Sequence, residues 1–148
     1  MNLSLAFTVL SWFLFYKASS QPLSLISKNQ LQYCVDLIYQ GEYLRASEIY
    51  SKLPQSQKKI EDVLEIFSLR WKYVPVQLSE KKDEYLTKII ETNKLTQNDL
   101  DTGNSMDAFL YVSTEIFLAE FYLASENTVA GYVACKKSLP HYFTVIHA

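Results

Sequence analysis

Residues that interrupt helices or build tight turns are scarce in this chain. Its 148 residues include only 3 glycines and 4 prolines, too few for the many turns of a β-sandwich or β-barrel. The 2 cysteines lack the CxxC spacing of zinc sites, and we expect His141 and His147 to be surface residues of a terminal segment. The composition therefore predicts an all-α fold and no metal or other cofactor.

Signals for catalysis and for nucleic-acid binding are also missing from the sequence. The formal net charge is −2, whereas nucleic-acid-binding domains carry basic faces. The sequence contains no GxSxG, GxGxxG, P-loop or HExxH motif. Glu115 and Glu120 point in different directions on a helix, so we expect capping or surface roles for them rather than acid–base work. We therefore expect no enzyme activity, no catalytic residues and no nucleic-acid partner.

The two cysteines, Cys34 and Cys135, leave two arrangements open. In an oxidising compartment they could pair and close a loop of about 100 residues, which stabilises a fold by up to about 4.7 kcal/mol in the chain-entropy model. Both residues lie in apolar helical patterns, however, where a free cysteine behaves as a small hydrophobic residue. We favour two unpaired thiols, and no neighbour in the sequence would lower the pKa of Cys34 to make it a nucleophile.

Apolar and aromatic residues are abundant, and the first run of them, residues 3–16, has the features of a targeting segment rather than of a core helix. The chain is 49% hydrophobic and 14% aromatic, enough for one domain with a real core. Residues 3–16 carry no charge but are shorter than the ~20 residues of a membrane span. Ala18 and Ser20 follow as small residues suited to cleavage. We predict a secretory signal over 1–20, an extracytoplasmic location and an α-helical domain over 21–148. A membrane anchor formed by residues 3–16, or a buried first helix, is the alternative.

The spacing of apolar residues predicts a series of helices after this segment. Apolar residues recur at intervals of three and four, with prolines or polar runs between the segments. The expected helices cover 27–40, 43–53, 56–73, a segment from Ser79 to about residue 93, 106–125 and 128–139. Pro54 and Pro140 are expected to end helices, and residues 94–105 to form a loop. The last eight residues begin a further helix without a stop signal, so the array is open to continuation past residue 148.

Two predicted hairpins match each other at an offset of 86 residues. The match pairs Gly41 with Asn127, the two residue types that best tolerate a left-handed turn. It also pairs Pro54 with Pro140, the expected end of the second helix in each hairpin. Hairpins with the same turn and the same stop indicate a stacked helical repeat.

The first hairpin resembles a known repeat family. Its pattern Gly41-x-Tyr43-x-x-Ala46-x-x-x-Tyr50 resembles the turn and second helix of a tetratricopeptide repeat over residues 27–54. The resemblance implies that Gly41 opens the turn, that Ala46 lets two helices approach, and that the aromatic residues fill the space between repeats. A helical hairpin of no particular family is the alternative, since the hairpin over 106–140 lacks the alanine and aromatic pattern.

The resemblance implies a function as well as a fold. In a stacked array the first helices line a concave face that can hold a peptide. Lys28, Val35 and Tyr39 would approach that face, and we expect them to contact a protein or peptide partner. The expected protein is an exported, non-catalytic protein-interaction module built from antiparallel helical hairpins. The alternative is a secreted helical bundle whose aromatic helices over 106–125 and 128–139 enclose a small apolar ligand.

Overall fold

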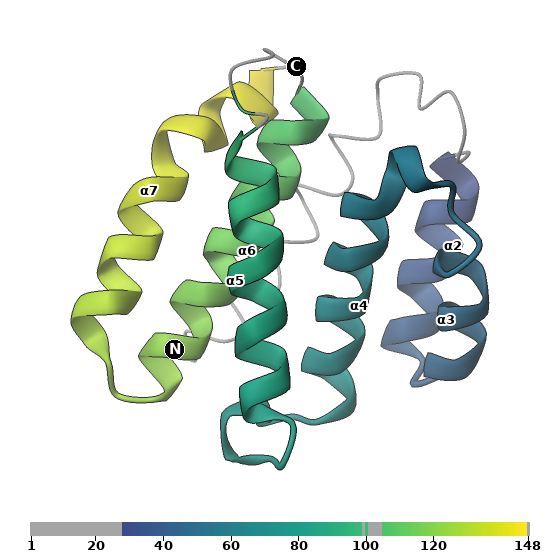
Figure 1. Cartoon of the computed structure of the whole chain (residues 1–148), viewed down its shortest axis with the longest axis horizontal. Helices are drawn as coiled ribbons and strands as arrows, with labels where there is room; N and C mark the ends of the chain where they lie inside the picture. Colours follow the sequence, from purple (N-terminus) through teal and green to yellow (C-terminus); the bar gives the residue numbers. More distant parts are fainter. Residues whose placement is uncertain (1–27, 99, 101–104, 148) are drawn as a thin grey trace. The chain divides into compact units, whose positions relative to one another are not determined.

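The chain folds into helices throughout the part that the structure describes. The computed structural model describes residues 28–98, 100 and 105–147 and contains six α-helices there, α2 to α7 (Figure 1). The predicted signal over 1–20, and with it the alternative anchor at 3–16, lies outside the described residues. Among the described helices, none combines the length and the apolar character that a membrane span requires. The all-α prediction is confirmed.

The described residues divide into two compact units. The first extends to Thr92 and the second begins at Asn93, so the boundary falls within α5. The first unit holds α2 (Lys28–Tyr39), α3 (Tyr43–Tyr50), α4 (Lys58–Lys72) and most of α5 (Lys82–Asn98). The second holds the end of α5 together with α6 (Ser105–Ala124) and α7 (Thr128–His147). Consecutive helices within each unit run antiparallel.

The α2–α3 hairpin is closed by a left-handed glycine and a close helix contact. Gly41 has φ of 79°, and the amides of Gly41 and Glu42 donate to the carbonyls of Ile38 and Leu37 at 3.1 and 2.9 Å. This pair of hydrogen bonds is the Schellman motif that ends α2. Ala46 is fully buried, and its carbonyl accepts a hydrogen bond from the Cys34 thiol at 3.7 Å. The small side chains of Cys34 and Ala46 therefore let α2 and α3 approach closely.

The helix ends of the first unit differ slightly from the sequence prediction. Because α3 ends at Tyr50, the chain leaves the helix before it reaches Pro54, which instead precedes a 3₁₀ turn at Gln55–Gln57. Tyr50 is buried and Tyr43 is half-buried.

The predicted helix start at Ser79 is three residues early, because α5 begins at Lys82. Ser79 instead caps a turn, in which its hydroxyl accepts a hydrogen bond from the Lys81 amide at 3.2 Å. A second 3₁₀ turn, Val76–Leu78, precedes it.

The predicted loop over 94–105 is wrong in its first half, because α5 continues to Asn98. Thr96 of this stretch and Asn93 just before it are buried rather than solvated. The Thr96 hydroxyl donates to the Asn93 carbonyl at 3.1 Å, and Asn93 itself bonds to α6. Hydrogen bonds inside the second unit thus satisfy side chains whose composition alone predicts a loop.

The predicted helix stop at Pro140 is also wrong, because Pro140 lies inside α7. A proline within a helix removes the hydrogen bond to the carbonyl four residues earlier, here that of Lys136. Pro140 and Lys136 are both exposed, so water can bond to the freed carbonyl. The Ser138 hydroxyl also donates to the Cys135 carbonyl at 2.8 Å in the same turn. Helix α7 therefore continues through the proline to His147.

The turn between α6 and α7 corrects the predicted role of Asn127. The left-handed residue is Glu126, with φ of 61°, while the Asn127 side chain accepts from the Ala130 amide at 3.3 Å and caps α7. The amides of Glu126 and Asn127 donate to Leu123 and Tyr122, the same Schellman pattern as at Gly41. Glu126 therefore corresponds to Gly41, so the structural offset between the turns is 85 residues rather than 86. The helices also differ in length: α2 and α3 have 12 and 8 residues, and α6 and α7 have 20 each.

The core of the second unit is the contact between α6 and α7. Every residue of α6 from Ala108 to Ala119 is buried, in agreement with a helix that is apolar on nearly all sides. Gly131 of α7 lies against α6, where an added Cβ would come within 2.6 Å of Leu123 Cγ. Small residues on the inner side of α7, Gly131, Ala134 and Ser138, permit this close packing.

Candidate functional site

The predicted partner-binding residues all lie on α2. Val35 is buried in the core of the first unit, and Tyr39, the last residue of α2, is half-buried. Lys28 is the first residue of α2, but its side chain is outside the described part of the structure. Val35 and Tyr39 therefore pack within their own unit, and their role in partner binding stays a prediction.

Tyr39 belongs to an aromatic cluster between α2 and α4. Its ring lies edge-on to Phe67 and Trp71, with ring centroids 5.4 and 5.0 Å away. Phe67 and Trp71 meet edge-on as well, at 6.3 Å. Phe67 is buried, whereas Tyr39 and Trp71 are partly exposed at the border of the core. Edge-to-face aromatic pairs contribute about 0.5–1.5 kcal/mol beyond the burial of their area, so this cluster holds α2 against α4.

Two polar atoms of the cluster are buried without a hydrogen-bond partner. They are the Tyr39 hydroxyl oxygen and the Trp71 indole Nε1. The guanidinium of Arg70, a residue only 8% exposed, lies 4.8 Å from the centroid of the Trp71 ring. Burial raises the pKa of Tyr39, and the positive charge of Arg70 opposes that rise. The cluster therefore combines two unsatisfied donors with a buried positive charge.

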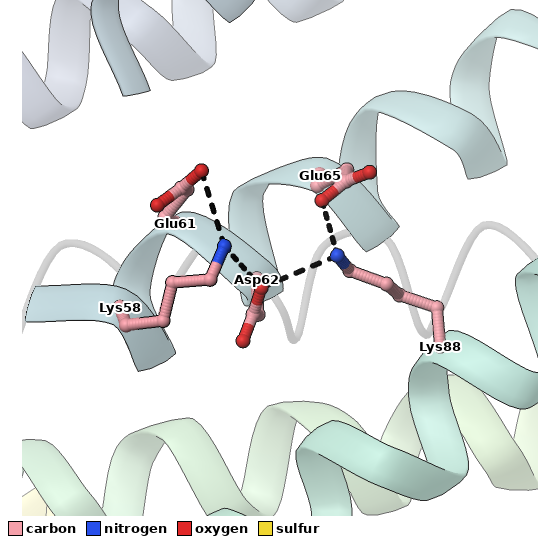
Figure 2. A network of polar contacts seen from close by, with 5 residues as sticks. All are labelled: Lys58, Glu61, Asp62, Glu65 and Lys88. Atoms are coloured by element: carbon pink, nitrogen blue, oxygen red, sulfur yellow. Dashed lines mark ion pairs between the residues drawn. The ribbon is translucent and has the colours of Figure 1, made fainter. Parts of the chain in front are cut away.

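An ionic network joins α4 to α5 within the first unit. Figure 2 shows that Lys58 and Lys88 both reach Asp62, at 3.1 and 3.2 Å. Lys58 also pairs with Glu61 at 3.2 Å, and Lys88 pairs with Glu65. Burial lowers the pKa of Lys88, but the hydrogen bonds and charges of Glu65 and Asp62 outweigh this effect and raise it. The two lysines offset two of the three negative charges, and the network supports the packing of α4 and α5.

Cys34 is a buried free thiol, and Cys135 is free as well. Burial in apolar surroundings raises the pKa of Cys34 from the ordinary 9.0 to about 11. Because the thiolate is the nucleophilic form, this shift argues against a catalytic role. The packing against Ala46 gives the thiol a structural role instead.

The raised pKa of Cys34 predicts a loss of stability at alkaline pH. The folded state holds the thiol proton more tightly than the unfolded state, so the stabilisation is complete below pH 9 and is lost as the pH rises through about 11. Between about pH 8 and about pH 10 we expect the free energy of unfolding to fall by about 1 kcal/mol from this group. Urea denaturation at the two pH values measures the fall. Cys34→Ala should remove this part of the pH dependence, whereas an unchanged dependence in that variant would contradict the assignment.

The second unit contains a buried polar cluster around Glu115. Glu115 is only 1% exposed, so the predicted surface or capping role is wrong for this residue. The Asn93 side-chain amide donates to Glu115 Oε1 at 3.1 Å and to the Thr114 hydroxyl at 3.0 Å. Thr114 in turn donates to the Tyr111 carbonyl at 2.8 Å. A carboxylate deep within the second unit is thus held by polar residues of α5 and α6.

Tyr111 completes the surroundings of Glu115. It lies one helical turn before Glu115 on α6 and forms a hydrogen bond with the carboxylate. Burial, together with the charge and hydrogen bond of Glu115, raises the pKa of Tyr111. The ring of His141, which is partly exposed, lies edge-on to Tyr111 at 5.3 Å. Neutral donors therefore surround the carboxylate, an arrangement that stabilises a unique packing of the core.

The outward face of α7 is apolar and exposed. Val129, Tyr132 and Val133 are 76%, 65% and 45% exposed, and Leu139 is 56% exposed. They lie on the side opposite the small residues that pack against α6. We call the residues Val129, Tyr132, Val133 and Leu139 the α7 stripe. Lys136 lies among them at helical spacing, and Lys137 at their edge, both exposed.

Neither metal-binding geometry nor a known relative identifies the protein. Within the described residues, no group of three or more His, Cys, Asp or Glu side chains is arranged to hold a metal ion. No protein-family model, curated protein or solved structure matches the chain. Three features of the described residues are candidates for a function: the Tyr39 cluster, the Glu115 cluster and the α7 stripe.

Sequence signals for two of these features exist but are easily missed. Tyr111, Thr114 and Glu115 share one face of an otherwise apolar helix, which indicates buried polar contacts. In α7 the small residues recur opposite Val129, Tyr132 and Val133, so the pattern distinguishes a packing face from an exposed one. The unsatisfied atoms of the Tyr39 cluster have no such signal, because they depend on how α2 and α4 meet.

Proposed function

We propose that the protein is an exported, non-catalytic protein-interaction module whose binding surface is the α7 stripe. The observation that carries the proposal is the exposure of Val129, Tyr132 and Val133 on a helix whose opposite side is used for packing. Exposed apolar residues that gather on one face mark interaction sites, whereas single ones need no explanation. Tyr132 adds an amphipathic aromatic side chain of the kind enriched at protein interfaces.

The charges of α7 favour a particular kind of partner. Lys136 lies near the middle of α7, which runs from Thr128 to His147. A two-fold pairing of α7 with the same helix of a second copy would bring the two Lys136 side chains together, and like charges at a contact are destabilising. A helix of another protein can instead offer apolar residues to the stripe and an acidic residue to Lys136. We therefore propose an amphipathic helix with acidic residues as the partner.

Further observations support the repeat architecture that we include in the proposal. Both hairpins turn through the same Schellman motif, at Gly41 and at Glu126, although their helices differ in length. The buried Ala46 beside Cys34 agrees with the small residue that a tetratricopeptide-like hairpin needs between its helices.

Export predicts a specific start of the mature protein. If residues 1–20 are a cleaved signal, mass spectrometry of the protein outside the cytoplasm will find Gln21 as the first residue. An intact Met1 in the membrane fraction would contradict cleavage and favour the anchor at residues 3–16.

The binding surface predicts the effect of substitutions in the α7 stripe. We expect the double variant Val129→Ser/Val133→Ser to weaken partner binding about 100-fold, since each valine loses part of the roughly 1.5–3 kcal/mol that its burial contributes. A photo-crosslinking amino acid at Tyr132 identifies the partner, and titration calorimetry of the purified pair measures the dissociation constant.

A matched control separates a specific surface from general stickiness. Leu44 is 80% exposed on α3, in the first unit, so Leu44→Ser removes a comparable exposed apolar side chain. We expect this variant to bind the partner as the unchanged protein does. Equal affinity of the α7 double variant and the unchanged protein would contradict the proposal. So would self-association through Tyr132 detected by sedimentation and crosslinking.

A further inference from the structure

The Tyr39 cluster contains hydrogen-bonding capacity that the protein does not use. The Tyr39 hydroxyl and the Trp71 indole nitrogen are buried without a partner, although their rings are only 5.0 Å apart. An unsatisfied buried donor costs about 1–3 kcal/mol, and buried polar groups in folded proteins are nearly always bonded. Two such atoms at one place therefore call for a physical explanation.

The charge at this place indicates what is missing. The indole nitrogen of Trp71 can only donate, and a tyrosine hydroxyl that lacks a partner can donate as well. The Arg70 guanidinium lies 4.8 Å from the Trp71 ring, and its charge acts on the Tyr39 hydroxyl. Two donors and a nearby positive charge suit an acceptor that is negatively charged and has two oxygens.

We propose that Tyr39, Trp71 and Arg70 form a binding site for a carboxylate, whose two oxygens accept hydrogen bonds from the Tyr39 hydroxyl and the Trp71 indole. Arg70 contributes its positive charge, which attracts the carboxylate, and needs no direct hydrogen bond to it. Tyr39 and Trp71 are partly exposed residues, so the site lies at the border of the core, where a ligand can reach it after a small side-chain movement. A free carboxylic acid and the carboxylate of a polypeptide share this chemistry. The site is independent of the α7 stripe, since it lies wholly in the first unit.

Trp71 provides a direct readout of this site. The chain has 2 tryptophans, Trp12 and Trp71, so Trp12→Phe leaves Trp71 as the sole tryptophan of the full chain. We expect acetate to change the Trp71 emission in a saturable way, because an acceptor bonds to the indole Nε1. Acetamide and chloride at the same concentration and ionic strength should give no saturable change. An equal response to either of them would mean that a carboxylate is not recognised and would overturn the proposal.

Substitution of one hydroxyl tests the geometry. Tyr39→Phe removes the hydroxyl and keeps the ring, so we expect acetate to bind about tenfold more weakly. Tyr33→Phe removes an exposed hydroxyl of α2 that accepts from Arg45 at 2.8 Å, and it should leave acetate binding unchanged. Equal acetate affinity in Tyr39→Phe and Tyr33→Phe, or the absence of a saturable response in the unchanged site, would overturn the proposal.

A peptide distinguishes the two sources of the carboxylate. Acetyl-triglycine with a free C-terminus presents a polypeptide carboxylate, and the same peptide with an amidated C-terminus lacks it. Tighter binding of the free peptide than of acetate indicates a polypeptide terminus as the natural ligand, whereas weaker binding indicates a small free acid. Equal binding of the free and the amidated peptide would contradict carboxylate recognition.

Discussion

Asn93→Leu is expected to lower the free energy of unfolding by about 3 kcal/mol or more. Asn93 donates to Glu115 at 3.1 Å and to Thr114 at 3.0 Å, and Glu115 is only 1% exposed. Leucine has the same branched arrangement of side-chain heavy atoms as asparagine but no donor, so the substitution leaves a buried carboxylate with one hydrogen bond fewer. Loss of a partner exposes the full desolvation penalty of the charged group, which exceeds the net value of the bond. Urea denaturation followed by far-ultraviolet circular dichroism measures the change.

A double variant tests whether the stability lost in Asn93→Leu comes from the uncompensated Glu115 carboxylate or from disturbed packing of the core. In Asn93→Leu/Glu115→Leu both partners are apolar, and no charge remains to be solvated. We expect this double variant to recover most of the lost stability, because replacing a buried polar pair by apolar residues is often close to neutral. A double variant as unstable as the sum of its single substitutions would indicate lost packing rather than an uncompensated carboxylate.

Phe67→Ala is expected to lower the free energy of unfolding by about 3–5 kcal/mol. Phe67 is 2% exposed and lies between Tyr39 of α2 and Trp71 of its own helix. Its removal leaves a cavity and deletes two edge-to-face contacts, each worth about 0.5–1.5 kcal/mol beyond area burial. Trp71 lies in the same cluster, so its fluorescence in the Trp12→Phe chain follows the unfolding of the first unit directly.

Phe67→Leu is the matched control for the aromatic contribution. Leucine keeps most of the buried volume but has no ring, so we expect it to lose clearly less stability than alanine does. A loss below about 1 kcal/mol for Phe67→Ala would mean that the site collapses around the missing ring. It would also mean that the Tyr39 cluster does not hold α2 to α4.

Two features of the first unit follow closely from its local sequence. The predicted helix over 56–73 corresponds closely to α4, because its apolar residues repeat with the helical period and its ends carry suitable charges. The turn at Gly41 was predictable because few residues other than glycine adopt positive φ without strain. These features depend on residues close together in the chain, which is why the sequence alone indicates them.

The site residues were harder to predict for a different reason. The sequence marks Val35 and Tyr39 as candidate contacts, but Val35 is buried in the core of the first unit, and the Tyr39 ring packs on Phe67 of α4. The left-handed residue of the second turn is Glu126 rather than Asn127, because the hydrogen bonds that end α6 set the turn one residue earlier. Propensity favours asparagine for positive φ, but here the side chain of Asn127 caps α7 instead.

Local patterns in the chain are enough to predict the all-α fold, the positions of most helices and the glycine that turns the first hairpin, since periodicity, scarce glycine and scarce proline act locally. Packing between helices sets the burial of Glu115, the continuation of α7 through Pro140 and the exposure of Val129, Tyr132 and Val133. Each of these depends on which neighbour covers a given helix face. A carboxylate is tolerated inside when donors from another helix reach it, and a helical proline is tolerated when water can reach the carbonyl that it frees.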